Sequence, residues 1–251
     1  MKIYRLGGYQ SWLIHTSTSK IIIDPWLTNK LSIPGASWLL SRSQEENLNA
    51  IIDKILDSDI LLISSNYADH LNKESLSLLP KNIKVFCSKS SYKSLKNIGF
   101  IDLNILNPGQ NIVANQLSLK GIMSGFPYSY SSLSFLIEDL TNNKRIFIEP
   151  HVVSLKSINS ITNLDAFIGT TESVKLLQIE LSMSPSRVFN ILEILKPKYF
   201  LPTGTNANAN EGFLNNFLSI KGNYQDLQDL LDLSELSTKI VCTDADNEVL
   251  L

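Results

Sequence analysis

The sequence predicts an α+β protein built as a four-layer αββα sandwich, in which helices flank two central mixed β-sheets. Short strand-like runs alternate with segments of helical period through the first half of the chain, and the same order returns in the second half. Because a sheet must bury its apolar face against another layer, two sheets in the middle with helices outside fit this order. With 251 residues, 43% of them hydrophobic and 18% charged, the chain is expected to form a single domain over residues 1–251.

The first elements are three short strands, at residues 2–6, 12–15 and 20–24. Two glycines follow the first strand, and residues 16–19 read Thr-Ser-Thr-Ser, so both connections are expected to be turns. Short strands joined by tight turns predict an antiparallel meander.

The next segment changes from loop to helix and then to a buried strand. Residues 28–43 have no clear period and contain Pro34-Gly35, so we expect a loop there. Within residues 45–56, four apolar residues are spaced i, i+3, i+4 and i+7, which predicts an amphipathic helix. The apolar run at residues 60–63 has the length of a buried strand.

The middle of the chain continues this alternation. Residues 72–79 form a short expected helix before Pro80, and residues 88–97 form another, with Ser88 or Ser90 as its N-cap. A polar, aromatic loop is expected at residues 124–132. The expected strands are 83–87, 102–106, 111–113, 117–123, 133–138 and 145–148, of which the last two form a hairpin.

The last third of the chain contains one strongly marked helix. Ser184 stands at its N-cap, Pro185 at its first position, and a buried stripe continues to Leu195. The other expected elements are strands at 165–168 and 199–201, a polar loop at 202–210, helices at 211–220 and 226–233, and a closing hairpin of 239–243 and 248–251.

Composition excludes several classes of partner. A net charge of −2 gives no basic surface for nucleic acid or anionic membrane, and no apolar run reaches the roughly 20 residues of a membrane span. The N-terminus lacks the apolar core of a signal peptide, so we expect a cytoplasmic protein. Cys87 and Cys242 are expected to be buried core thiols rather than a disulfide.

The candidate site follows the apolar strand at residues 60–63. That strand turns polar within one residue and leads to Asp69 and His70. A buried strand that carries a carboxylate and an imidazole to its end is a common way to build a metal site. The alternative is a purely structural role, in which Asp69 caps the next helix and His70 packs at the sheet edge.

Several pieces of the chain occur in an order that is specific when they are taken together. These are Ile23-Asp24-Pro25-Trp26-Leu27, the segment 59–64, Asp69-His70-Leu71 with the helix end before Pro80, Arg145-Ile146-Phe147-Ile148, and the segment 195–202. In these pieces, and over nearly its whole length, the chain resembles the metallo-β-lactamase superfamily, with the ascorbate-phosphate lactonase-like hydrolases as the most similar branch. The resemblance implies an αββα sandwich with a metal site at one edge of the paired sheets.

The family motif His-x-His-x-Asp-His is incomplete in this chain. Ser65 and Tyr67 stand where the first two histidines are expected, and Thr203-Gly204-Thr205 stands where the last one is expected. The chain has only three histidines, His15, His70 and His151, so a dinuclear site with five histidines is impossible. His15 alternates with apolar neighbours and is expected to be an ordinary strand residue.

The resemblance implies a reduced, mononuclear site. Asp69 and His70 match a pair of metal ligands in the family, and Glu149 or His151 falls near the family's bridging aspartate. Together these four residues would hold one divalent metal, Zn²⁺ or Mn²⁺, whose bound water acts as the nucleophile. Asp69 is also a candidate general base.

Four further residues are expected to support the site or its substrate: Asp24, Ser65, Asn66 and Tyr67. Asp24 is expected to orient backbone amides near the site. The Tyr67 phenol either fills the space of a missing histidine or donates a hydrogen bond to a substrate oxyanion. Tyr128 and Tyr130 lie on a loop that the family places beside its active site.

Two hypotheses for function remain open. The first is a metal-dependent hydrolase of a small ester, lactone or phosphoester. The second is a catalytically inactive family member that binds a small molecule or a protein without any metal. The oligomeric state does not follow from the sequence.

Overall fold

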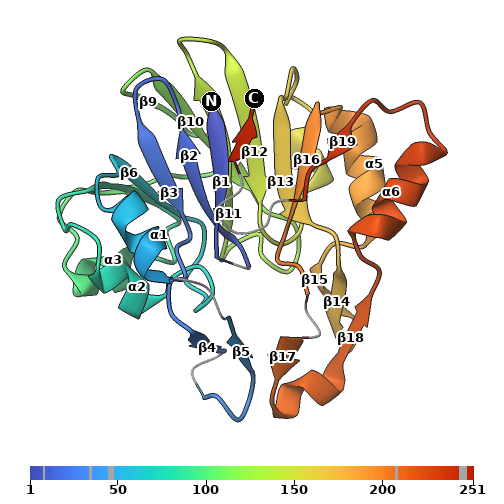
Figure 1. The fold of residues 1–251 in the computed structure, drawn as a ribbon, viewed down its shortest axis with the longest axis horizontal. Coiled ribbons are helices and arrows are strands. Elements are labelled where there is room, and N and C mark those ends of the chain that lie inside the picture. The colour runs from blue at the N-terminus through green and yellow to red at the C-terminus, as the bar shows by residue number, and fades with distance from the viewer. Residues whose placement is uncertain (8, 34–35, 45–47, 207–208, 243–247) are drawn as a thin grey trace.

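Two seven-stranded sheets lie face to face, with helices on both outer surfaces (Figure 1). The computed structural model describes residues 1–251 except for 8, 34–35, 45–47, 207–208 and 243–247. The fold class predicted from the sequence, a four-layer αββα sandwich, is confirmed.

The first sheet has the strand order β20-β1-β2-β3-β6-β7-β8. The meander of the first three strands is antiparallel as predicted, and the strands from β3 to β8 run parallel. The strand bounds are β1 (Lys2–Leu6), β2 (Ser11–His15), β3 (Lys20–Ile23), β6 (Ile60–Ile63), β7 (Lys84–Cys87), β8 (Leu103–Ile105) and β20 (Glu248–Leu250).

The second sheet has the order β19-β16-β13-β12-β11-β10-β9. It is antiparallel from β9 to β12 and parallel from β12 to β19. The strand bounds are β9 (Asn111–Ala114), β10 (Leu117–Met123), β11 (Leu133–Asp139), β12 (Lys144–Glu149), β13 (Ala166–Thr170), β16 (Tyr199–Thr203) and β19 (Lys239–Ile240).

Three apolar clusters hold the four layers together. One fills the space between the sheets, and each of the others lies between one sheet and its helices. In β6, Ile60 and Leu62 point into the central cluster, whereas Leu61 and Ile63 point toward the helices. Alternate residues of a strand face opposite sides, so a strand buried on both sides has the continuous apolar run seen here.

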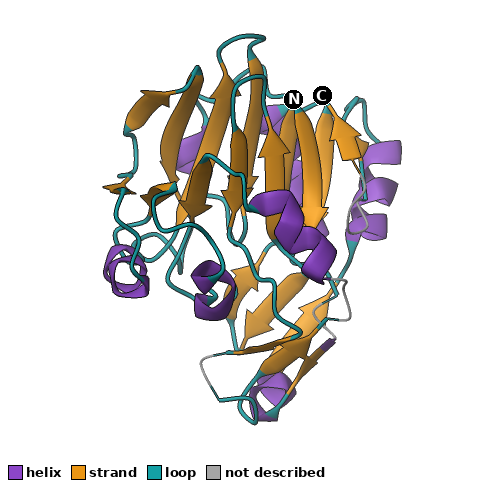
Figure 2. Cartoon of the chain, turned by 60° about the vertical axis from the view of Figure 1, so that its left-hand side comes forward, coloured by secondary structure: helices purple, strands orange, loops and turns teal. Residues whose placement is uncertain are grey.

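Helices cover the outer faces of both sheets (Figure 2). The first sheet is covered by α1 (Leu48–Ile55), α2 (Lys73–Ser77) and α3 (Tyr92–Ile98), and the second by α4 (Leu155–Ile158), α5 (Pro185–Leu195) and α6 (Tyr224–Asp232). Ser184 caps α5 as predicted, whereas α3 begins after Ser91 rather than Ser88 or Ser90. No helix of the described residues is both long and apolar enough to cross a membrane.

Two small sheets form a lobe below the sandwich in Figure 1. One contains β4 (Lys30–Ser32), β5 (Ser41–Ser43) and β17 (Asn210–Glu211), and the other β14 (Ser173–Leu176), β15 (Ile179–Ser182) and β18 (Leu218–Lys221). The expectation of an unstructured loop at 28–43 was therefore wrong for β4 and β5, whereas Pro34-Gly35 lies outside the described residues.

The predicted helix at 211–220 was also wrong. The chain instead forms β17, a 3-10 turn at Phe213–Phe217, and β18. β18 pairs with β14 over Leu218–Lys221, so tertiary hydrogen bonding decides the conformation of this segment. The helix propensity of a short apolar segment does not show that the segment will pair with a strand more than 40 residues away.

The prediction of a closing hairpin was wrong for those of its residues that the structure describes. Lys239–Ile240 pairs in parallel with β16 in the second sheet, whereas Glu248–Leu250 pairs antiparallel with β1 in the first. The two segments thus join different sheets. Cys87 is buried as predicted, but Cys242 is exposed.

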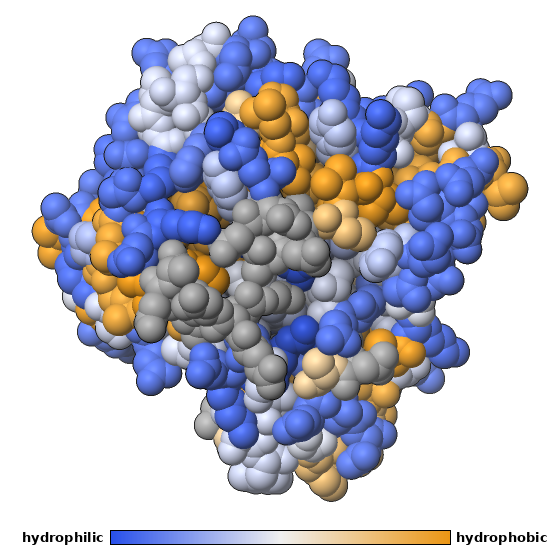
Figure 3. Space-filling view, viewed as in Figure 1, coloured by the Kyte–Doolittle hydropathy of each residue, from blue (hydrophilic) through white to orange (hydrophobic). Residues whose placement is uncertain are grey.

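Hydrophilic side chains dominate much of the face in Figure 3, which also shows hydrophobic patches at the left and from the upper centre toward the right. Large apolar side chains such as Trp12, Trp26 and Phe135 are at most 1% exposed. Trp12 and Phe135 belong to the cluster between the sheets, whereas Trp26 is buried outside the three clusters.

Candidate functional site

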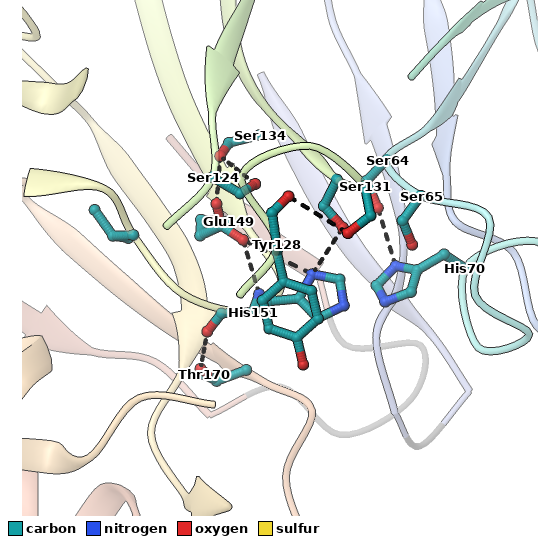
Figure 4. Close-up of polar contacts among 12 residues, drawn as sticks. Ser64, Ser65, His70, Ser124, Tyr128, Ser131, Ser134, Glu149, His151 and Thr170 are labelled. Carbon is teal, nitrogen blue, oxygen red and sulfur yellow. Dashed lines mark hydrogen bonds and ion pairs between the residues drawn. The ribbon is translucent and has the colours of Figure 1, made fainter. Parts of the chain in front are cut away.

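The candidate site lies where strands of the two sheets end side by side. Ser64 follows β6, Glu149 ends β12, and Thr170 ends β13. Ser65 forms an isolated bridge with Ser132, which joins the end of β6 to the start of β11. Because parallel strands present their carboxyl ends at one edge, this edge gathers polar side chains from distant parts of the sequence (Figure 4).

Asp24 fixes the position of His70. It follows β3 in a left-handed conformation with a φ of 46°. Its Oδ1 accepts a hydrogen bond from the backbone N–H of Ser64 at 2.8 Å, and its Oδ2 accepts one from His70 Nδ1 at 2.8 Å. Both side chains are at most 2% exposed, so the pair is fully buried.

Asp69 lies on the opposite side of the His70 ring. Its Oδ2 is 3.5 Å from His70 Nε2, and its side chain is 15% exposed. The Gln10 amide donates to Oδ2 at 2.9 Å and to the Asp69 carbonyl oxygen at 3.1 Å. Gln10 Nε2 also lies 3.0 Å from His70 Nε2, and the donor and acceptor roles of these two nitrogens depend on the tautomer of the ring.

The two carboxylates keep the His70 imidazole charged. Burial alone would lower its pKa, but the charges of Asp69 and Asp24 outweigh burial and raise the pKa of His70 to about 10. The pKa of Asp69 moves the opposite way: burial would raise it, and the His70 charge and hydrogen bond hold it well below its usual range. The two carboxylates on either side of the ring therefore favour the charged form of His70.

Glu149 points away from His70, toward Ser124 and Ser134 (Figure 4). Ser134 Oγ donates to its Oε2, and the backbone N–H of His151 donates to its Oε1 at 2.9 Å. Burial raises the pKa of Glu149 to about 7, although these hydrogen bonds act in the opposite direction.

His151 belongs to an aromatic stack. Its ring lies 4.0 Å from that of Tyr128 at an interplanar angle of 26°, and 4.4 Å from that of His70. Tyr67 meets Tyr128 edge-on at 5.8 Å and donates its hydroxyl hydrogen to Ser131 Oγ at 3.0 Å. Burial, followed by the nearby His70 charge, lowers the pKa of His151 well below its ordinary value, so this imidazole is neutral.

The remaining candidates lie at the margin of the site or outside it. Ser65 is buried, with its Oγ 3.4 Å from the backbone N–H of Tyr67. Asn66 is exposed and accepts a hydrogen bond from Ser94 Oγ of α3. His15 contacts Tyr4 at the end of β2, 4.9 Å between ring centroids. The supporting roles of Asp24, Ser65, Asn66 and Tyr67 stay predictions.

The four predicted ligands come near one another but do not fit a single metal ion in this conformation. Ligand atoms of Zn²⁺ lie about 2.0–2.2 Å from the metal. Both oxygens of Glu149 accept protein hydrogen bonds, and the Gln10 amide contacts the facing donor atoms of Asp69 and His70. Among the described residues, no three His, Cys, Asp or Glu side chains form a group that could hold a metal. A metal role for Asp69, His70, Glu149 and His151 therefore stays a prediction.

A pocket of about 320 Å³ opens over Asp69 and His151. Its floor includes Tyr9, Gln10, Tyr67 and Tyr128, and the lower lobe supplies its far wall. The apolar wall residues are Ile33 and Leu40 from the β4–β5 segment, and Val174, Leu181 and Leu218 from the β14–β15–β18 sheet. The two small sheets thus convert the edge of the sandwich into a mostly apolar cavity, which is typical of small-molecule sites.

Sequence reasoning missed Gln10 and the serines that bind Glu149. Gln10 meets Asp69 across 59 residues of sequence, and no local pattern around it indicates that contact. Ser134 lies in β11, where β12 pairs antiparallel with it. A hairpin prediction with a fixed register could have placed Ser134 near Glu149.

The fold and this edge site are those of a known superfamily. Residues 5–204 match the beta-lactamase superfamily domain, and the chain belongs to this family. A comparison with curated proteins finds no match.

Solved structures with the same fold include enzymes of several kinds. An isothiocyanate hydrolase from Delia radicum gut bacteria is 14% identical, with a TM-score of 0.74 over 100% of this chain and 99% of that one. A possible metal-dependent hydrolase from Veillonella parvula is 13% identical, with a TM-score of 0.70 over 98% and 100%. CmlA, a diiron β-hydroxylase from Streptomyces venezuelae, is 13% identical, with a TM-score of 0.71 over 100% of this chain and 54% of CmlA. At such identities the likeness shows the fold alone, and the lactonase-like branch stays a prediction.

Proposed function

We propose that this chain is a metal-independent member of the superfamily that binds a small, largely apolar molecule in the cavity above Asp69 and His151. The observation that carries the proposal is the hydrogen bonding of the edge site. His70 is held between Asp24 and Asp69, Gln10 bonds to Asp69, and Glu149 is held by Ser134. A donor set already paired within the protein must lose those bonds before it can bind a metal.

The cavity supports the binding half of the proposal. Five aliphatic side chains from the two small sheets face an aromatic floor, in a volume of about 320 Å³. Burying apolar ligand surface there would contribute about 25 cal/mol per Å². The Tyr128 hydroxyl donates to the Leu181 carbonyl oxygen at 3.0 Å and so ties the floor to the wall.

A metal-dependent hydrolase is the second candidate. It is supported by the metal-dependent hydrolases that share the fold, and by Asp69 and His70, whose donor atoms lie 3.5 Å apart beside the cavity. It requires the Gln10 amide to leave and a third ligand to turn inward. Under this alternative the metal is Zn²⁺ or Mn²⁺ and the substrate a small ester, lactone or phosphoester.

Metal analysis separates the two candidates. For protein purified without a chelator or a metal-binding tag, we expect less than about 0.1 Zn or Mn per chain, because the described residues contain no group of donor atoms that is open to the ion. Added Zn²⁺ or Mn²⁺ should leave the Tm unchanged to within about 1 °C. One metal per chain, abolished by Asp69→Ala and His70→Ala in folded protein, would instead establish the hydrolase candidate.

Ligand binding is tested with the neutral fluorescent probe N-phenyl-1-naphthylamine. We expect saturable binding that Val174→Trp weakens by about tenfold or more, because the larger ring fills the cavity. Ile179→Trp is the matched control: this residue lies in the same β14–β15 hairpin but is 44% exposed. Equal binding by both variants would show that the probe binds elsewhere.

A further inference from the structure

Among the described residues that line the cavity, Asp69 is the one that carries a formal charge. The others are aliphatic or aromatic side chains, polar uncharged side chains, and the imidazole of His151. Other charged groups lie behind the lining: His70 and Asp24 below Asp69, and the Arg42 guanidinium, which stacks on Tyr9 and interacts with Asp69. A cation in the cavity would therefore contact the Asp69 carboxylate directly.

The Asp69 carboxylate has capacity left for a ligand. Its interactions with Gln10 and His70 both use Oδ2. No side chain of the described residues hydrogen-bonds to Oδ1. No lysine or arginine lines the described part of the cavity, so an anionic ligand would find no charged partner there.

Three tyrosine rings share the cavity with this carboxylate: Tyr9, Tyr67 and Tyr128. The Tyr128 ring stacks on His151 at 4.0 Å, and Tyr67 meets Tyr128 edge-on at 5.8 Å, so these rings form one aromatic surface beside the carboxylate. The Tyr9 ring already holds one cation, the Arg42 guanidinium, 4.2 Å from its centroid. Aromatic faces attract cations within about 6 Å, and cages of such rings recognise ammonium groups.

We propose that the ligand of this cavity is a small organic cation, an amine or quaternary ammonium with a hydrocarbon portion. Its cationic head lies against Asp69 among the tyrosine rings, and its hydrocarbon portion packs against Ile33, Leu40 and Leu218. This inference rests on the proposed function, since it names the class of molecule that the cavity binds.

A pair of isosteric probes tests the charge directly. Benzyltrimethylammonium is a cation, and 2,2-dimethylpropylbenzene is the same shape with carbon in place of nitrogen. We expect the cation to bind about tenfold or more tightly than the neutral probe, measured by ligand-observed NMR titration. Asp69→Asn should remove most of this preference while leaving binding of the neutral probe within about twofold.

Tyr67 offers an independent variant, because it is 40% exposed and its replacement spares the buried core. Tyr67→Phe keeps the ring face and should keep cation binding within about twofold, whereas Tyr67→Leu should weaken it severalfold. Circular dichroism and thermal melting check the fold of each variant.

The outcomes separate the two proposals. If both probes bind equally and Asp69→Asn changes neither, the cation proposal is overturned and the apolar binding site stands. If neither probe binds and N-phenyl-1-naphthylamine does not bind either, the proposed function itself fails.

Discussion

Replacing Asp24 with asparagine is expected to lower the free energy of unfolding by about 3–5 kcal/mol, because it leaves a buried imidazolium without one of its two counter-charges. Asp24 accepts from the Ser64 backbone and from His70 Nδ1, and both side chains are at most 2% exposed. Asparagine tolerates the left-handed φ of 46° at this position, so backbone strain adds little. Urea unfolding measured at pH 6–7 gives the difference directly.

The pH dependence of this loss identifies its cause. The pKa of His70 is raised to about 10 in the folded protein, against 6.5 as its ordinary value. A raised histidine pKa stabilises the fold fully below pH 6.5, and the stabilisation disappears as the pH rises through 10. The difference between wild type and Asp24→Asn should therefore be largest near pH 6 and shrink toward pH 10.

A double-mutant cycle supplies the control. In the His70→Gln variant there is no imidazolium that could be left without a counter-charge. Asp24→Asn should therefore lower the free energy of unfolding markedly less in this variant than in the wild type. A cost below about 1 kcal/mol in the wild-type background would contradict the charged triad of Asp24, His70 and Asp69.

The sequence predicted elements whose signals are local. Two tight turns define the β1–β2–β3 meander, Ser184 and Pro185 mark the start of α5, and the run at Ile60–Ile63 marks β6. Each signal lies within a few residues of the element it specifies, and burial on one or both faces makes it strong.

Where the conformation or the pairing of a segment depends on a distant partner, the sequence prediction was wrong. β18 is a strand because β14 lies beside it, and β19 and β20 join different sheets although only a few residues separate them. Tertiary pairing overrides local propensity in such short segments.

The candidate site, too, could be predicted from the sequence only in part. Asp69, His70, Glu149 and His151 do come together at one edge, as the order of strands implied. What each side chain contacts there could not be predicted, because Gln10 and Ser134 reach the site through sheet register. Those contacts decide whether the four residues are free to bind a metal.

The free energy of unfolding of the wild-type protein is expected to fall as the pH rises from 4.5 to 7. In the Glu149→Gln variant this fall should be absent. Burial raises the pKa of Glu149 from its ordinary 4.5 to about 7. Between these values the unfolded chain loses the proton and the folded protein keeps it, so unfolding becomes more favourable with rising pH. A shift of this size corresponds to about 3 kcal/mol, which the uncharged glutamine does not lose.

The measurement is the free energy of unfolding of both proteins from pH 4 to pH 8. The difference, variant minus wild type, should rise by about 3 kcal/mol across this range, and the contribution of His70 cancels because both proteins contain it. Ser134→Ala tests the mechanism. The Ser134 hydrogen bond lowers the pKa of Glu149, so without this bond the fall in the free energy of unfolding should continue to higher pH. A difference that does not change with pH would mean that the pKa of Glu149 in the folded protein equals its ordinary value, so that the carboxyl is ionised at neutral pH. In that case its carboxylate would carry a full negative charge at neutral pH beside His151, which would strengthen the metal-dependent alternative.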